Sequence, residues 1–361
     1  MLFGVSTLLF GCNSVKTYLV GTYTTSKNEG INIIEFNEKT KNLKIQTVIQ
    51  GVENPSFVIA NKNKSIIIAV GETEGKKGGL VTSFIYDKES NEFVKVNSLN
   101  TLGNHPCTVA FSPDEDYVLV GNYTGGNLSV FKIDSNGKLH DTNQLIQYEG
   151  NSVNVERQEK PHVHSVVFHP SLPYVFVADL GRDAIEMIPY DNNSKLFLNE
   201  TTSKSIKTKA GSGPRHMVFN REGTLLYVTY ELTNEIGVFA LKENTLSHIK
   251  TISLLENETV KGSSAELRIS DDQKFLYASV RGLDNTIVVM KIDGAYLEII
   301  QRITTDKTPR NFIISNDQRS VLVANQNSNS VVVYDRNIKT GLLNKTNNHI
   351  EISKPVYFYP L

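Results

Sequence analysis

Hydrophobic and polar residues follow one another in short blocks along this chain, and the stretch from His105 to Asp134 shows the repeating unit most clearly. A proline-led apolar segment is followed by a Ser-Pro-Asp-Glu-Asp turn and a second apolar segment at Tyr117–Asn122. A Thr-Gly-Gly-Asn turn then leads to a third apolar segment at Leu128–Ile133. Short β-branched and aromatic runs separated by such turn residues are typical of strands. The stretch predicts an antiparallel β-meander.

The same pattern recurs along the chain at a nearly constant interval. Segments that begin like the one at Pro106 start at Pro55, Val163, Pro214, Ser264, Pro309 and Pro355. The intervals between successive starts are 51, 57, 51, 50, 45 and 46 residues. A repeat of this length with about four short strands is the signature of a β-propeller.

The last repeat holds only one strand before the chain ends at Leu361. Strands that complete it are predicted at the other end of the chain, at Tyr18–Tyr23, Gly30–Asn37 and Leu43–Gln50. The sequence therefore predicts an all-β, seven-bladed propeller with four-stranded antiparallel blades, in which the N- and C-terminal strands share one blade. Closure of this kind leaves no open sheet edge at the seam.

Residues 1–14 differ from the rest, and residues 15–361 form the predicted propeller domain. The apolar run Met1–Gly11 precedes Cys12, and Leu9–Cys12 resembles the lipobox of bacterial lipoproteins. If Cys12 is processed, we expect an envelope lipoprotein tethered to a membrane through this residue. No Lys or Arg precedes the apolar run, although signal peptides begin with positive charge. The alternative is an uncleaved cytoplasmic protein.

Composition excludes several classes of partner. The formal net charge is −1, the 37 Lys and Arg residues are scattered among 38 Asp and Glu residues, and there are two cysteines. No basic patch suits nucleic acid, and neither cysteine has the spacing of a metal site. The chain also lacks a serine-elbow, Walker, dinucleotide or zinc-protease motif. We therefore expect no nucleic-acid partner, no metal and no organic cofactor.

Candidate functional residues emerge when equivalent positions of the repeats are compared. Three such columns fall near the start of the first strand and the end of the second, where a propeller places residues around its central channel. These columns contain the charged or imidazole residues His164, Arg215, His216, Glu231, Glu266, Arg281 and Arg310, and the polar residues Asn311 and Gln326. Buried charges are costly unless they are paired or used. They predict either a site for an anionic ligand or a ring of paired charges that closes the channel.

Several segments resemble the lactonase family of seven-bladed propellers, which is typified by the propeller-type 6-phosphogluconolactonase and includes the carboxy-cis,cis-muconate lactonizing enzyme. The resemblance covers the chain from about Tyr18 to Leu361, and it rests on the motifs KPHVHSVVFHP, GPRHMVF, LLYVTYEL, SAELRIS, FLYASVRG, TPRNF and VLVANQNSNSV. It implies that the catalytic residues are His164, Arg215, Glu231 and Arg281. The other column residues, His216, Glu266, Arg310, Asn311 and Gln326, are then predicted to bind the substrate.

The resemblance implies hydrolysis of a sugar lactone, most simply a small anionic lactone of the 6-phosphogluconolactone type. Arg215 and Arg281 are expected to hold an anionic group and to polarise the carbonyl. Glu231 or His164 would take a proton from water, and the sequence leaves that choice open. The alternatives are a lactonizing enzyme acting on a carboxylated muconate-like or extracellular sugar acid, and a non-catalytic propeller that binds a ligand or protein.

Overall fold

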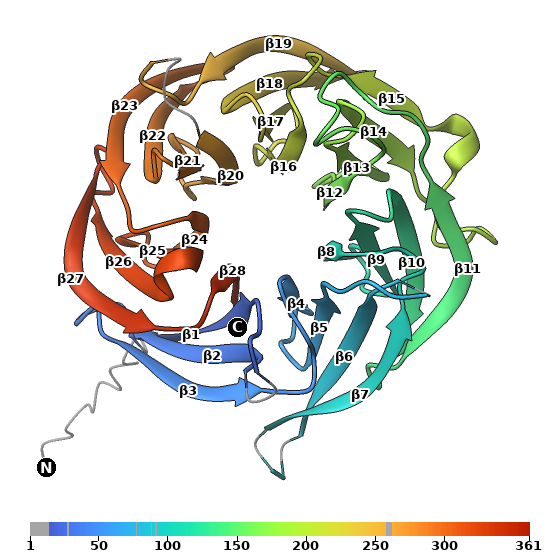
Figure 1. The fold of residues 1–361 in the computed structure, drawn as a ribbon, viewed down its shortest axis with the longest axis horizontal. Coiled ribbons are helices and arrows are strands. Elements are labelled where there is room, and N and C mark those ends of the chain that lie inside the picture. Colours follow the sequence, from blue (N-terminus) through green and yellow to red (C-terminus); the bar gives the residue numbers. More distant parts are fainter. Residues whose placement is uncertain (1–13, 27–28, 77, 88, 91, 258–261) are drawn as a thin grey trace, which may run out of the picture.

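The computed structural model describes residues 14–26, 29–76, 78–87, 89–90, 92–257 and 262–361. The predicted signal-like segment, including Cys12, lies outside the described residues except for Ser14. The described residues form seven four-stranded antiparallel sheets arranged as blades around a central channel (Figure 1). The predicted seven-bladed propeller is confirmed.

Each blade has one inner strand beside the channel. The inner strands are β28 (Pro355–Pro360), β4 (Val58–Ala60), β8 (Pro106–Phe111), β12 (Val163–Phe168), β16 (Pro214–Phe219), β20 (Gly262–Ile269) and β24 (Pro309–Ile314). The second strands, in the same order, are β1 (Val15–Thr22), β5 (Ile66–Gly71), β9 (Tyr117–Asn122), β13 (Tyr174–Asp179), β17 (Leu225–Tyr230), β21 (Phe275–Gly282) and β25 (Ser320–Asn325).

The two outer strands complete each blade. The third strands are β2 (Ile31–Asn37), β6 (Leu80–Asp87), β10 (Asn127–Ile133), β14 (Ala184–Pro189), β18 (Glu235–Lys242), β22 (Thr286–Asp293) and β26 (Ser330–Arg336). The fourth strands are β3 (Leu43–Ile49), β7 (Glu92–Asn100), β11 (Leu139–Gln147), β15 (Lys204–Lys207), β19 (Thr245–Ser253), β23 (Tyr296–Thr304) and β27 (Leu343–Glu351). The described helices are two short 3₁₀ turns, η1 (Glu200–Thr202) and η2 (Gln326–Ser328), and no described helix has the length and apolarity needed to cross a membrane.

The two ends of the chain meet in one blade, as the sequence predicts. Strand β28 pairs antiparallel with β1, so that Tyr18 lies opposite Pro360 and Thr22 opposite Pro355. The second strand of this blade differs slightly from its prediction, because β1 begins at Val15 and ends at Thr22. This pairing supplies the inner strand that the N-terminal part of the chain lacks, and it closes the ring.

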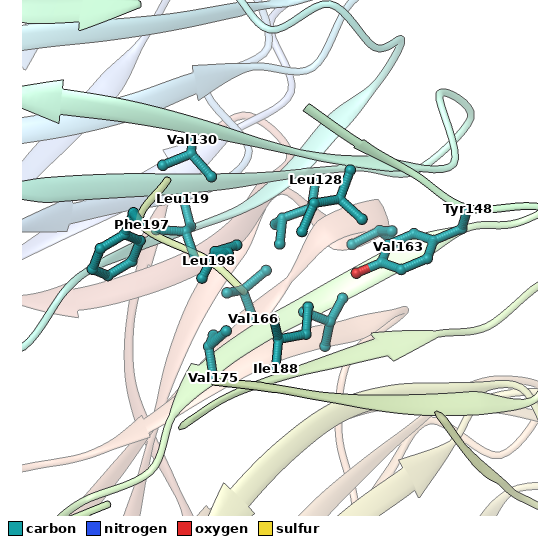
Figure 2. Close-up of a cluster of buried hydrophobic side chains, with 12 residues drawn as sticks. Leu119, Leu128, Val130, Tyr148, Val163, Val166, Val175, Ile188, Phe197 and Leu198 are labelled. Atoms are coloured by element: carbon teal, nitrogen blue, oxygen red, sulfur yellow. The ribbon is translucent and has the colours of Figure 1, made fainter. Parts of the chain in front are cut away.

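The hydrophobic core lies between neighbouring blades. Figure 2 shows one such layer, where Leu119 and Leu128 of one blade pack near Val163 and Val175 of the next. Each blade is covered on both faces, so its central strands are apolar at successive positions: all six residues of β5 are buried. Burial of this area, at about 25 cal/mol per Å² of apolar surface, is the main stabilising term.

A β-bulge near the start of the inner strand recurs in six blades. The pairing register shifts at Val163/Ser165, Pro214/Met217, Ser264/Leu267, Pro309/Asn311, Pro106/Thr108 and, in the closing blade, Gly21/Thr22. A bulge sets two residues opposite one and redirects side chains locally. Adjacent residues such as Arg215 and His216 therefore both border the interior of the channel.

The channel has two mouths, which we name by the strand ends around them. At the upper mouth the inner strands begin and the second strands end. At the lower mouth the inner strands end and turns lead into the second strands.

Candidate active site

One cavity opens at each mouth of the channel. The upper cavity has a volume of about 570 Å³ and is lined by Tyr23, Glu72, Cys107, Tyr123, Arg157, His164, Glu231, Ser263, Arg281, Gly282, Thr308 and Arg310. The lower cavity, of about 530 Å³, is lined by apolar strand residues together with Lys62, Glu115, His216, Glu266 and Arg268. Between the two, the channel is almost filled by side chains that include His164, Arg215 and His216.

Glu231 is the centre of the upper site. It directly follows β17, and its backbone N–H donates to the Gly213 carbonyl at 2.8 Å, which fixes its place at the strand end. Its carboxylate Oε2 accepts from Nε of Arg215 at 2.7 Å and lies 3.1 Å from Nη2 of Arg281. Nη2 of Arg157 donates to Oε1 at 2.7 Å. One buried carboxylate therefore holds three guanidinium groups.

His164 lies beside this cluster. Its Nε2 is 3.9 Å from Oε2 of Glu231, and its ring packs edge-on against the rings of Tyr123 and His216 with both centroid distances at 5.4 Å. Burial and then the charge of Arg215 hold the pKa of His164 well below its usual value. The imidazole is therefore neutral at neutral pH and has a nitrogen free to accept a proton.

The charges around Glu231 also set its protonation state. Burial alone raises the pKa of this carboxyl, but the surrounding guanidinium groups and the His164 ring hold it well below the usual value. Burial lowers the pKa of Arg281 to about 9 despite the attraction of Glu231, so Arg281 still carries its charge at neutral pH. Arg281 is further fixed by hydrogen bonds to Ser263, at 2.7 Å to Oγ and 3.1 Å to the carbonyl.

Arg310 occupies a different part of the upper cavity. Its Nη2 donates to the Tyr23 hydroxyl at 2.9 Å, and its guanidinium carbon lies 5.2 Å from the centre of that ring. The Tyr23 hydroxyl in turn donates to Oε1 of Glu72 at 2.9 Å. Three blades contribute this chain of contacts, and they are the blades that contain β24, β1 and β5.

A second buried carboxylate, Glu266, organises the lower mouth. Its Oε2 accepts from the Asn311 amide and lies 3.3 Å from Nδ1 of His216 and 3.5 Å from Nη2 of Arg268. Its Oε1 accepts from the backbone N–H of Leu267 at 3.0 Å. Burial opposes the charge, but Arg268, His216 and these hydrogen bonds lower the pKa of Glu266 to about 2.

Comparison with known proteins identifies the family. The model of the seven-bladed β-propeller lactonases matches residues 17–360. The chain belongs to this lactonase family. Membership supports lactone hydrolysis, and the reactive side chains of such an enzyme are then expected in one of the two channel cavities.

Named relatives of this lactonase-family chain cover nearly all of it. The 6-phosphogluconolactonase of Formosa agariphila is 30% identical over 331 residues, which are 90% of this chain and 94% of the relative. The 6-phosphogluconolactonase of Bacillus subtilis is 29% identical over 93% of this chain and 96% of its own length. The structure of the periplasmic gluconolactonase of Pseudomonas aeruginosa is 30% identical and superimposes with a TM-score of 0.88, covering 96% of this chain and 99% of that one.

The structure brings the four predicted catalytic residues together at the upper mouth. His164, Arg215 and Arg281 all lie within 4 Å of the Glu231 carboxylate. Of the predicted substrate-binding residues, Arg310 lines the same cavity. Their chemical roles stay predictions.

The other predicted substrate-binding residues lie elsewhere. His216 and Glu266 line the lower cavity, and Asn311 binds Glu266 there and accepts from the Phe358 backbone N–H at 3.1 Å. Gln326 begins η2 and its N–H donates to the Thr308 carbonyl at 2.9 Å, but it is not among the described residues that line either cavity.

Sequence comparison of the repeats misses Arg157. It lies in the loop between β11 and β12, which is longer than the corresponding loop of every other repeat. The interval of 57 residues between the starts at Pro106 and Val163, the longest in the chain, is the one signal of this insertion. The neighbouring Gln158 is fully buried and donates to the Leu180 carbonyl at 2.8 Å, which anchors the loop so that Arg157 reaches Glu231.

The upper cavity also contains the side chain of Cys107. Cys107 is a free, buried thiol that lines the upper cavity, and burial raises its pKa, so it stays protonated. Within the described ranges, no group of three or more His, Cys, Asp or Glu side chains is placed to hold a metal ion.

Proposed function

We propose that this protein opens a sugar lactone to its acid at the upper mouth, with 6-phosphogluconolactone as the first substrate to test. The observation that carries the proposal is the convergence of His164, Arg215 and Arg281 on the buried carboxylate of Glu231 inside a cavity of about 570 Å³. Two relatives that align over almost the whole chain are named 6-phosphogluconolactonases.

The charge of the upper site favours an anionic substrate. Four guanidinium groups (Arg157, Arg215, Arg281 and Arg310) surround two carboxylates (Glu72 and Glu231) in and beside this cavity. Two positive charges therefore remain, since His164 is neutral. A cavity with low-dielectric walls focuses such an excess, and a phosphate monoester would neutralise it.

In the proposed reaction, His164 is the general base. Water attacks the lactone carbonyl carbon and forms the new C–O bond, while its proton passes to Nε2 of His164. The carbonyl oxygen becomes negative and is stabilised by Arg281, whose guanidinium stays charged. The ring C–O bond then breaks, and the protonated His164 gives its proton to the leaving alkoxide. The product is the open-chain acid.

Glu231 then acts on the arginines rather than on water. Its two oxygens are held by guanidinium groups, and its lowered pKa makes it a weak proton acceptor. Its carboxylate keeps Arg215 and Arg281 side by side despite their mutual repulsion. The His164 ring has no such direct guanidinium contact. Burial is the main cause that lowers its pKa, and a substrate anion near the arginines would offset the second cause, the charge of Arg215.

A second candidate substrate is an unphosphorylated gluconolactone. It is supported by the name of the similar structure from Pseudomonas aeruginosa, a periplasmic gluconolactonase. Export of this chain would favour it too, since Cys12 and its apolar leader fit a lipoprotein signal. A lipid on Cys12 would tether the protein to a membrane. Membrane fractionation of cells that express the full chain or a Cys12→Ala variant tests the tether.

The experiment on function measures acid release from freshly prepared 6-phosphogluconolactone above its spontaneous hydrolysis. We expect catalysed turnover by the wild-type protein and by an Arg319→Ala control, because Arg319 is exposed in the turn before β25 on the lower side. A His164→Ala variant should lose most of the rate. Absence of turnover on both 6-phosphogluconolactone and glucono-1,5-lactone would contradict the proposal.

A further inference from the structure

The arginines of the upper cavity differ in what they bind. Arg157, Arg215 and Arg281 each contact a carboxylate oxygen of Glu231. Arg310 instead donates to the neutral hydroxyl of Tyr23, and it forms no ion pair with a carboxylate within the described parts of the chain. A guanidinium has five N–H donors. Among the four arginines, Arg310 is therefore the one whose charge is not already offset by a contacting carboxylate in the described residues, which leaves it available to an incoming anion.

Tyr23 and Glu72 fix the orientation of Arg310. A carboxylate only accepts hydrogen bonds, so the proton of the Tyr23 hydroxyl must point at Oε1 of Glu72, 2.9 Å away. The oxygen lone pairs of Tyr23 are then directed toward Nη2 of Arg310. Burial, opposed by Arg310 and assisted by Glu72, raises the pKa of Tyr23, so the phenol keeps its proton at neutral pH.

Among the described residues, the carboxylate of Glu72 has one hydrogen-bond partner, the Tyr23 hydroxyl. Its second carboxylate oxygen, Oε2, is buried and has no hydrogen-bond partner in the described structure. A buried acceptor without a partner destabilises a fold. Its position is explained if the carboxylate serves the contacts of Tyr23 and Arg310 rather than the packing of the blade.

The location of Arg310 suits one end of an elongated substrate. His164, Glu231 and Arg281 come from the consecutive blades that contain β12, β17 and β21. Arg310 comes from the blade that contains β24, directly next to the blade of Arg281, and Tyr23 and Glu72 come from the two blades that follow it around the ring in Figure 1. A ligand whose carbonyl contacts Arg281 can therefore reach Arg310 on the neighbouring blade with its other end, since both arginines line the same cavity.

We propose that Arg310 binds the terminal phosphate of a phosphorylated sugar lactone, and that Tyr23 and Glu72 are positioning residues that hold Arg310 for this task. The proposal rests on the lactonase function above and adds where the phosphate lies. It also separates the binding of the anion from the polarisation of the carbonyl, which falls to Arg281.

The test compares two substrates. Initial rates are measured with 6-phosphogluconolactone and with glucono-1,5-lactone for wild type, Arg310→Ala, Tyr23→Phe, Glu72→Ala and Glu72→Gln, with Arg319→Ala as control. Arg310→Ala should raise KM for the phosphorylated lactone about tenfold or more while changing kcat much less, since it removes charged hydrogen bonds to one end of the substrate. The change in KM for glucono-1,5-lactone should be markedly smaller.

The positioning variants should give a graded result. Tyr23→Phe keeps the ring under the guanidinium but removes the hydroxyl, and we expect a KM increase of about three- to tenfold for the phosphorylated lactone only. Glu72→Ala should match it, whereas Glu72→Gln, which retains an acceptor oxygen, should recover most of the wild-type KM. Equal losses on both substrates, or a fall in kcat with KM unchanged, would overturn the proposal.

Calorimetric titration with 6-phosphogluconate and with inorganic phosphate separates this proposal from the function. If the wild-type protein binds 6-phosphogluconate and Arg310→Ala does not, the phosphate site stands even where no lactone is hydrolysed. If lactones are hydrolysed but binding of 6-phosphogluconate does not depend on Arg310, the function stands and the phosphate site is rejected.

Discussion

The two mouths of the channel contain the same kind of cluster, a buried glutamate among basic side chains, yet their charges differ. At the lower mouth Lys62 and Arg268 are matched by Glu115 and Glu266. At the upper mouth the guanidinium groups outnumber the carboxylates, and among the described residues Arg310 is the one of the four without a carboxylate contact. A cluster in which positive and negative charges balance can be explained by the stability of the fold. An excess of buried charge of one sign is costly unless a bound ligand neutralises it.

The partners of the two glutamates show the same contrast. Glu266 accepts from a backbone N–H and from the Asn311 amide, and Asn311 in turn accepts from Phe358 of the closing blade. These contacts join neighbouring blades at the seam. Glu231 accepts side-chain hydrogen bonds from arginines. We therefore assign Glu266 mainly to stability and Glu231 mainly to function.

Removal of the upper carboxylate should have the largest effect. Glu231→Ala leaves three guanidinium groups without their shared counter-ion, so we expect kcat/KM to fall about 10³-fold or more, together with a loss of about 3–5 kcal/mol in the free energy of unfolding. Kinetics and urea denaturation measure both. Glu222→Ala, an exposed glutamate of the same blade, is the control. Wild-type kinetics in Glu231→Ala would show that Glu231 has no role in catalysis.

Loss of the proposed base should affect mainly the rate. His164→Ala should lower kcat about 10²- to 10⁴-fold, the usual contribution of a general base, and it should cost less stability than Glu231→Ala because it leaves no charge unpaired. The exposed His248→Ala serves as the control. A His164 variant with unchanged kcat would assign the proton transfer elsewhere.

The lower glutamate should show the opposite effect. Glu266→Gln removes a charge that Arg268 and His216 both face, and we expect a loss of about 3 kcal/mol in the free energy of unfolding. At a temperature well below unfolding, kcat/KM should stay within about threefold of the wild type. A large loss of activity in a stable, folded Glu266→Gln protein would support the sequence-based prediction that this residue binds substrate.

The pH dependence gives the smallest effects. Both glutamates have folded-state pKa values below those of the unfolded chain, so each contributes stability above the unfolded value, and this is lost as the pH falls toward the folded value. For Glu266 the loss should extend from about pH 4.5 to about 2. Denaturation midpoints measured across this range should fall less for Glu266→Gln than for wild type. Parallel curves would contradict the assignment.

The fold could be predicted from sequence because the propeller repeats itself. Each repeat carries the same turn residues and apolar runs, and the single strand at Pro355 required partners from the N-terminus. Even the limits of Tyr117–Asn122 agree with β9. The start of β1 could not be placed as well, since Val15 and Lys16 precede the apolar core of the strand and pair with Asn37 and Phe36 near the end of β2.

The site could be predicted only in part. Comparison of repeats identified His164, Arg215 and Arg281, because they replace ordinary residues at equivalent positions. The comparison of repeats could not show which mouth each residue belongs to. His216 follows Arg215 directly, and the bulge places both side chains in the channel, although Arg215 binds the glutamate of the upper mouth and His216 that of the lower. The comparison missed Arg157 because the shorter loops of the other repeats have no position equivalent to it.

The most direct test pairs one arginine from each mouth, Arg281→Ala at the upper and Arg268→Ala at the lower, in one assay of 6-phosphogluconolactone hydrolysis corrected for the spontaneous rate. Each variant removes one guanidinium from one buried glutamate. We expect Arg281→Ala to lose about 10²-fold or more in kcat/KM, and Arg268→Ala to retain kcat/KM within about threefold and to lose stability instead. Equal losses, or a greater loss in Arg268→Ala, would contradict the assignment of catalysis to the upper mouth.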